Sequence, residues 1–159
     1  MNIKVEEVIT LQVPASAEYI DLVRLTLYGL AVKIGFSYEE IEDMKVAVSE
    51  ACNNAVLYAY GDLGTGEAAP VPQPAPRIEV RFIKKNDALS IIVKDDGRSF
   101  DASAAAARAK PVDGKSIDEL QAGGLGLFLM QALMDDVEVN SETGTEVVLT
   151  KRLVKSGEM

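Results

Sequence analysis

The chain contains no histidine, and Cys52 is the only cysteine among its 159 residues. Without histidine it cannot build a Ser-His-Asp triad, a histidine-ligated zinc site or a phosphohistidine relay of its own. A lone cysteine cannot form an internal disulfide or a cluster of thiolate metal ligands. These absences exclude several classes of enzyme before any motif is considered.

Positive charge is also scarce, with 16 basic against 25 acidic residues and a net charge of −9. The basic stripe typical of nucleic-acid-binding proteins is not visible, and an acidic surface opposes binding to an anionic membrane. A nucleotide ligand is still compatible with this charge, because backbone N–H groups and Mg²⁺ hold phosphates without a basic surface. The longest apolar stretch, near residues 22–32, is interrupted by Arg24 and is shorter than the roughly 20 residues that span a bilayer. The first ten residues show no signal-peptide pattern, so we expect a cytoplasmic protein.

The length suits one domain, and we predict a single domain over residues 1–159. Residues 61–76 hold four of the six prolines and predict an exposed, partly extended loop. Residues 98–122 lack a regular apolar period, and a loop of this length in a compact domain usually has a function or is mobile.

Periodicity and capping residues predict the elements between these loops. Ser16 can cap a first helix that Gly35 ends, and Ser37 and Glu40 form a capping box for a long second helix. Strands are predicted at residues 3–13, 77–83, 88–93, 137–140 and 145–153, and helices at 16–34, 38–60 and 123–134. Because the later strands are linked as hairpins, we expect an α+β, two-layer sandwich with helices on one face of a mixed, mainly antiparallel sheet.

One polar pair on the long helix is a candidate site. Glu50 and Asn54 are four residues apart and therefore share a helix face in a segment that is otherwise small and apolar. An amide oxygen is a suitable ligand for Mg²⁺, and a carboxylate one turn earlier can accept a proton from a hydroxyl. The alternative interpretation is a solvated polar stripe on an amphipathic helix.

Three further segments could contact a nucleotide. Asp95 ends a buried strand and can accept a hydrogen bond from an exocyclic amine, while Gly97 would let a ring approach the backbone. The glycine-rich segment 123–126 can present N–H groups to an anion at a helix start, although it is neither a Walker A loop nor a Rossmann fingerprint. Thr145, at the start of the last strand, could support Asp95 through water. Each segment alone is also explained by a turn or a loop-to-helix junction.

In order and spacing, these segments resemble the GHKL family of ATPases and kinases. Residues 40–56, 24–27 and 123–135 are more specifically similar to the serine-protein kinases and anti-sigma factors of the sigma-B type (RsbW-like). The resemblance covers nearly the whole chain and implies a Bergerat-type fold that binds ATP and Mg²⁺. Residue 99 departs from the pattern, because many members have glycine where this chain has Ser99.

The resemblance also implies residue roles. Glu50 would be the general base, Asn54 the Mg²⁺ ligand, and Asp95 with Gly97 the adenine-binding pair. The phosphates would lie along the glycine-rich helix start, with Thr145 behind the adenine and Arg24 on a partner surface. The residues implied to contact nucleotide at that helix start are Gly123, Gly124, Leu125, Gly126 and Leu127.

The partners implied are a sigma factor and an anti-anti-sigma (STAS-domain) protein, the serine substrate, both bound by a homodimer. Two alternatives remain open at this point. One is a sporulation-type anti-sigma kinase that acts on a different sigma factor. The other is a binding module that sequesters sigma and uses ATP without catalysis.

Overall fold

The structure is a computed structural model that describes residues 6–59, 76–95, 125–140 and 145–154. The predicted loop at 61–76, apart from Pro76, and the predicted long loop at 98–122 lie outside these residues. In chain order the elements are β1 (Glu7–Pro14), a 3-10 turn η1 (Ala17–Tyr19), α1 (Ile20–Ile34), α2 (Tyr38–Ala59), β2 (Arg77–Lys84), β3 (Ala88–Asp95), α5 (Leu125–Leu133), β4 (Asp136–Asn140) and β5 (Glu146–Arg152). No helix in the described ranges is long and apolar enough to cross a membrane.

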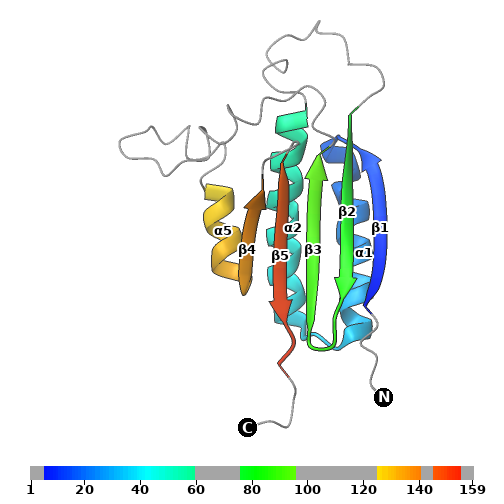
Figure 1. The fold of residues 1–159 in the computed structure, drawn as a ribbon, viewed down its shortest axis with the longest axis vertical. Coiled ribbons are helices and arrows are strands. Elements are labelled where there is room, and N and C mark those ends of the chain that lie inside the picture. Colours follow the sequence, from blue (N-terminus) through cyan, green and yellow to red (C-terminus); the bar gives the residue numbers. More distant parts are fainter. Residues whose placement is uncertain (1–5, 60–75, 96–124, 141–144, 155–159) are drawn as a thin grey trace, which may run out of the picture.

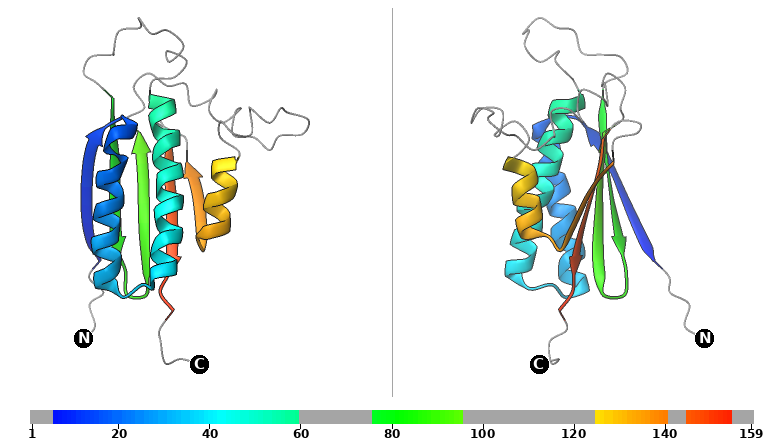
Figure 2. Two further views of the ribbon diagram at one scale, coloured as in Figure 1. Left: turned by 180° about the vertical axis from the view of Figure 1, so that it is seen from behind. Right: turned by 60° about the vertical axis from the view of Figure 1, so that its left-hand side comes forward.

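The strands form one five-stranded sheet in the order β1-β2-β3-β5-β4. All four described pairings are antiparallel, so the sheet in this part of the chain is antiparallel throughout, in line with the predicted mainly antiparallel sheet. The helices lie on one face of the sheet, with α2 between α1 and α5 (Figure 2). The predicted α+β sandwich with a one-sided helix layer is therefore confirmed.

The predicted helix boundaries follow from local chemistry. The Ser16 hydroxyl accepts a hydrogen bond from the Glu18 amide, although the capped turn is 3-10 and α1 proper begins only at Ile20. Gly35 ends α1 in the left-handed region at φ 110°, where residues with a Cβ are strained. The Ser37 capping box is formed in both directions: the Glu40 amide donates to Ser37 Oγ at 3.1 Å, and the Ser37 amide donates to Glu40 Oε1 at 2.8 Å.

The core lies between the sheet and the helix layer. Strand alternation turns Val80 and Phe82 of β2 and Ile91 and Val93 of β3 toward the helices, and all four are buried. The predicted apolar face of α2 is buried against them, namely Ile41, Met44, Val48, Ala51, Cys52 and Ala55. At one end of this sandwich lie the C-terminal ends of α2 and β3 and the starts of α5 and β5 (Figure 1). The described residues of the predicted nucleotide site, among them Asn54, Asp95, Gly126 and Thr145, lie toward this end.

Candidate functional site

Glu50 and Asn54 lie on the flank of α2 that packs against α5. Gly126, in the first turn of α5, is buried there. A Cβ added to Gly126 would lie 3.0 Å from Glu50 Oε2 and 3.5 Å from Asn54 Nδ2. The structure thus brings Gly126 next to Glu50 and Asn54, which lie on neighbouring turns of α2 and are 76 and 72 positions away in the sequence. Both polar side chains of α2 are half-buried, so they are not a fully solvated stripe.

Asp95 and Thr145 form the second part of the site, at the same end of the sheet. Asp95 is the last residue of β3 and is 1% exposed. Its amide donates to the Thr145 carbonyl at 3.3 Å, and the Thr145 amide donates to Asp95 Oδ1 at 3.4 Å. These bonds continue the β3–β5 ladder by one residue and fix the carboxylate on the helix-facing side of the sheet.

The Thr145 hydroxyl is a buried polar atom with an unmet hydrogen bond. In the described part of the chain, Thr145 Oγ1 has no hydrogen-bond partner. A buried hydroxyl in this state has a high desolvation cost unless water or a ligand completes its bonding. The neighbourhood of Asp95 and Thr145 therefore fits a polar group that enters from outside the chain, as the predicted adenine site requires.

The donor set also fits a magnesium-bound polyphosphate. Asn54 offers an amide oxygen, a hard ligand that Mg²⁺ accepts, and phosphate and water oxygens usually complete its shell. No group of three or more carboxylate or thiolate side chains that could hold a metal by themselves occurs in residues 6–59, 76–95, 125–140 or 145–154. A metal at Asn54 would therefore depend on its ligand's own oxygens.

The remaining predicted residues divide into two groups. Leu125 and Leu127 are described, the first exposed and the second half-buried at the start of α5. Gly97, Gly123 and Gly124 lie outside the described residues, as does Ser99, and their predicted roles stay predictions.

Arg24 lies on the other flank of α2, between α1 and α2. Its Nη1 donates to Ser49 Oγ at 3.0 Å, and its Nη2 forms an ion pair with Asp21. The Arg24 side chain is 36% exposed, and its hydrogen bond to Ser49 links α1 to α2. Sequence reasoning missed both neighbours. The spacing of Asp21 and Arg24 by three residues could have suggested their pair, whereas Ser49 is brought close only by helix packing.

Cys52 has no part in the predicted site. Burial raises the pKa of its thiol to about 12, and the nearby positive charge of Arg24 opposes this shift. A thiol so far from ionisation at neutral pH is a weak nucleophile, so Cys52 is a core residue.

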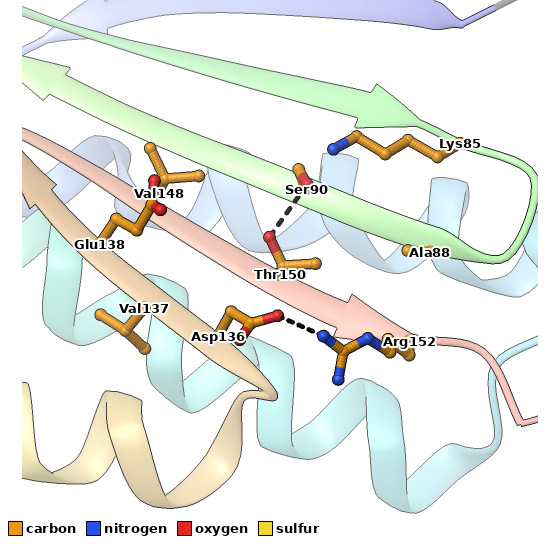
Figure 3. A pocket seen from close by; sticks show the side chains of 9 residues that line it. All are labelled: Lys85, Ala88, Ser90, Asp136, Val137, Glu138, Val148, Thr150 and Arg152. Carbon is orange, nitrogen blue, oxygen red and sulfur yellow. Dashed lines mark hydrogen bonds and ion pairs between the residues drawn. The ribbon is translucent and has the colours of Figure 1, made fainter.

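Two hollows are found on the surface of the described residues. One of about 600 Å³ lies on the open face of the sheet, with the helices behind it, and is lined by the Ser90–Thr150 hydroxyl pair and the Asp136–Arg152 ion pair (Figure 3). No predicted site residue lines it. A second hollow, of about 270 Å³, is lined by Asp95 together with Arg77, Glu79 and Lys94 of the neighbouring strand positions.

Comparison with known proteins agrees with this arrangement. Residues 13–151 match the family described as histidine kinase-like ATPase domain. The serine-protein kinase RsbW of Bacillus pumilus is 46% identical over 150 residues, which cover 92% of this chain and 86% of that protein. The RsbW of Bacillus subtilis is 43% identical over 146 residues, covering 91% and 85%.

The fold is shared with a solved structure. A crystal structure of the RsbU and RsbW domains of a Mycobacterium tuberculosis protein matches with a TM-score of 0.61 at 20% identity. The match covers 94% of this chain and 33% of that longer chain. The family match, the identities and the site geometry lead to one conclusion: the chain belongs to the histidine kinase-like ATPase domain family and, within it, to the RsbW serine-protein kinases.

Proposed function

We propose that this chain is an anti-sigma factor and an ATP-dependent serine-protein kinase that acts by partner switching. It sequesters a sigma factor of the sigma-B type and phosphorylates a serine of an anti-anti-sigma (STAS-domain) protein, which then dissociates. The observation that carries the proposal is the close packing of Gly126 beside Glu50 and Asn54, where an added Cβ would lie 3.0 Å and 3.5 Å from their side chains. This packing brings the predicted base and metal ligand next to the predicted phosphate-binding helix start. The compartment that suits this function is the cytoplasm.

Each residue has one chemical task in this proposal. When bound, ATP with Mg²⁺ supplies the γ-phosphoryl group and neutralises charge that develops during transfer. Glu50 accepts the proton of the attacking serine hydroxyl, and Asn54 holds Mg²⁺ through its amide oxygen. Asp95, supported by Thr145, accepts a hydrogen bond from the adenine amine. The first turn of α5, from Leu125 onward, presents N–H groups and the positive end of its dipole to the phosphates.

The proposed base is tested by Glu50→Gln, which keeps the size of the side chain and removes its basicity. Loss of a general base lowers kcat by about 10²- to 10⁴-fold. We expect phosphate transfer from radiolabelled ATP to the anti-anti-sigma protein to fall by that range, with nucleotide affinity changed by less than a few fold. Unchanged transfer would remove Glu50 from the mechanism. Transfer absent from the wild-type chain, with sigma binding intact, would favour the non-catalytic module.

The proposed metal ligand needs a separate readout. Titration calorimetry of Asn54→Ala with ATP should show a larger loss of affinity in the presence of Mg²⁺ than in EDTA. Asn53→Ala is the matched control, because Asn53 is the neighbouring asparagine and is exposed to solvent. Equal losses with and without Mg²⁺ at position 54 would contradict the metal role.

We place one partner-binding contact at Arg24. Its partly exposed guanidinium is held in position by Asp21 and Ser49, which suits recognition of a carboxylate on a partner. Arg24→Lys keeps the charge but not the planar, two-pronged geometry. Sigma-factor affinity should fall about tenfold while ATP binding is unchanged. An unaltered affinity in a pull-down and in calorimetry would take Arg24 out of the partner surface. We also propose that the active species is a homodimer.

A further inference from the structure

Helix α5 carries the proposed phosphate-binding turn, yet its apolar packing does little to fix its position along its own axis. Its fully buried large side chain is Met130, joined by Met134 directly after the helix, whereas its leucines are half-buried or exposed. Methionine is flexible and fits irregular space, and hydrophobic burial is non-directional. The close approach of Gly126 to Glu50 therefore needs a further constraint.

A directional constraint is found at the other end of α5. Lys151 lies on β5, and strand alternation with the buried Val147 and Leu149 turns its side chain toward the helix layer. Its Nζ donates a hydrogen bond of 2.8 Å to the carbonyl of Leu133, the last residue of α5. The last carbonyls of a helix have no partner within the helix, and a cation there also stabilises the negative end of the helix dipole. This bond fixes the point at which α5 ends.

The connection from α5 to β4 is held to the same strand. The Asp135 amide donates to the Thr150 carbonyl at 2.9 Å, and the Arg152 amide donates to Asp135 Oδ2 at 2.6 Å. Three consecutive residues of β5 thus hold the end of α5 and the residue before β4. We call these bonds, made by Thr150, Lys151 and Arg152 to Leu133 and Asp135, the α5 clamp.

The lysine of the α5 clamp is not required by the core. Its side chain is half-buried, and the ion pairs found among the described residues do not include it. A half-buried ammonium without a carboxylate partner has a desolvation cost, which a methionine of similar length would avoid. The hydrogen-bond donor is therefore the property that distinguishes Lys151 from an apolar residue at this position.

Strand β5 connects both parts of the candidate site. Thr145, directly before the strand, pairs with Asp95, and six positions later Lys151 holds the end of α5. These two points are about 20 Å apart along the strand, at about 3.3 Å per residue. From the clamp, α5 extends back toward the site end of the sandwich (Figure 1), and its nine residues span about 13 Å. The strand thus sets the adenine part of the site directly and the phosphate part through α5.

We propose that Lys151 is a positioning residue for phosphate transfer. By holding the end of α5 it keeps Gly126 beside Glu50 and Asn54, so that the base and the metal ligand stay aligned with the phosphate-binding turn. The inference rests on the proposed function, because it concerns the rate of that reaction. Such a rate is sensitive to position, since a displacement of about 1 Å can lower it roughly 10²-fold.

The donor is tested by Lys151→Met, which keeps an unbranched side chain of similar length. We expect kcat for phosphate transfer to the anti-anti-sigma protein to fall by about 10- to 100-fold, with Tm lowered by about 4 °C or less. Lys151→Arg restores a charged donor and should return kcat to within about threefold of the wild type. Lys85→Met is the matched control, because Lys85 lines the hollow on the open face of the sheet, and it should leave kcat unchanged.

A double-mutant cycle with Gly126→Ala distinguishes positioning from general loosening. With the clamp intact α5 cannot yield to the new methyl group, so the Glu50 carboxylate must move. Without the clamp α5 can yield, and the same methyl group displaces the carboxylate less. Gly126→Ala should therefore lower kcat by a factor at least about threefold smaller in Lys151→Met than in the wild type.

Hydrogen exchange of the full chain without nucleotide or partner reports on the clamp itself. In Lys151→Met the amides of residues 125–133 should exchange about tenfold faster than in the wild type, with those of α1 unchanged, and Lys151→Arg should restore slow exchange. A wild-type chain that transfers no phosphate would overturn the proposed function and this inference with it. Where the wild type does transfer phosphate, four results would overturn the inference alone: an unchanged kcat in Lys151→Met, an equal loss in Lys85→Met, losses that multiply with Gly126→Ala, or unchanged exchange in α5.

Discussion

Replacing Gly126 with alanine should damage catalysis far more than folding. The new Cβ would lie 3.0 Å from Glu50 Oε2, closer than ordinary carbon–oxygen contact, and 3.5 Å from Asn54 Nδ2. Gly126 does not have a positive φ, so alanine fits the backbone. Because the nearest atom ends a flexible side chain, the carboxylate can rotate away at a cost of about 0.5–1.5 kcal/mol. The helix-propensity gain of alanine, up to about 1 kcal/mol, offsets much of this.

The catalytic consequence is larger, because general-base catalysis depends on the position of the carboxylate. A displacement of about 1 Å can lower a rate by roughly 10²-fold. We therefore expect Gly126→Ala to reduce kcat for phosphate transfer by about 10- to 100-fold. The free energy of unfolding, measured by urea denaturation, should stay within about 1 kcal/mol of the wild type.

A double-mutant cycle distinguishes this effect from general loosening of α5. Glu50→Asp shortens the side chain by one methylene and makes room for the new methyl group. Combined with Gly126→Ala, it should therefore lose less activity than the two separate losses multiplied together. Simple multiplication of the losses, or wild-type kcat with a lower free energy of unfolding in Gly126→Ala, would refute the reasoning. Either result would show that Gly126 serves packing and does not position Glu50.

Three further changes probe the fold. Between pH 9 and 12 the unfolded chain ionises Cys52 while the native chain keeps the thiol protonated, so the free energy of unfolding should fall by about 1.4 kcal/mol per pH unit from this group. Cys52→Ala should remove that fall, and parallel alkaline denaturation curves for the two proteins would contradict the buried, protonated thiol. Gly35→Ala places a Cβ on a residue with φ 110°, so the free energy of unfolding in urea should fall by about 1–2 kcal/mol, although no neighbouring atom obstructs the new Cβ. An unchanged free energy of unfolding would show that the left-handed helix cap is dispensable. Ser37→Ala removes one half of the capping box and should lower the free energy of unfolding by about 1 kcal/mol, with Ser16→Ala as a comparison at the weaker 3.4 Å cap; equal effects of the two changes would contradict this ranking.

The secondary structure could be predicted well because its causes are local. The local signals act within a few positions and are therefore visible in the sequence: the capping box of Ser37 and Glu40, the helix-ending Gly35, and the strand alternation around residues 85–87. The 3-10 start of the first helix was not predicted, because Ser16 as a cap permits either helical form. That the described sheet is antiparallel throughout depends on how β1 joins β2 and how β5 joins β3, which are contacts between segments distant in the sequence.

The candidate site was likewise predicted only as far as its causes are local in the sequence. The sequence by itself determined which residue types could serve: an acid and an amide one helical turn apart, an acid at the end of a strand, and glycines before a helix, with histidine and cysteine chemistry excluded. It could not determine that Gly126 lies against Glu50, that Thr145 pairs with Asp95 or that Ser49 holds Arg24. These contacts join residues 25 to 76 positions apart, and they exist only because α1 and α5 pack on opposite flanks of α2 while β5 pairs with β3. Periodicity reveals which face of an element is buried, but the neighbour of that face is fixed only when hydrophobic burial draws the layers together.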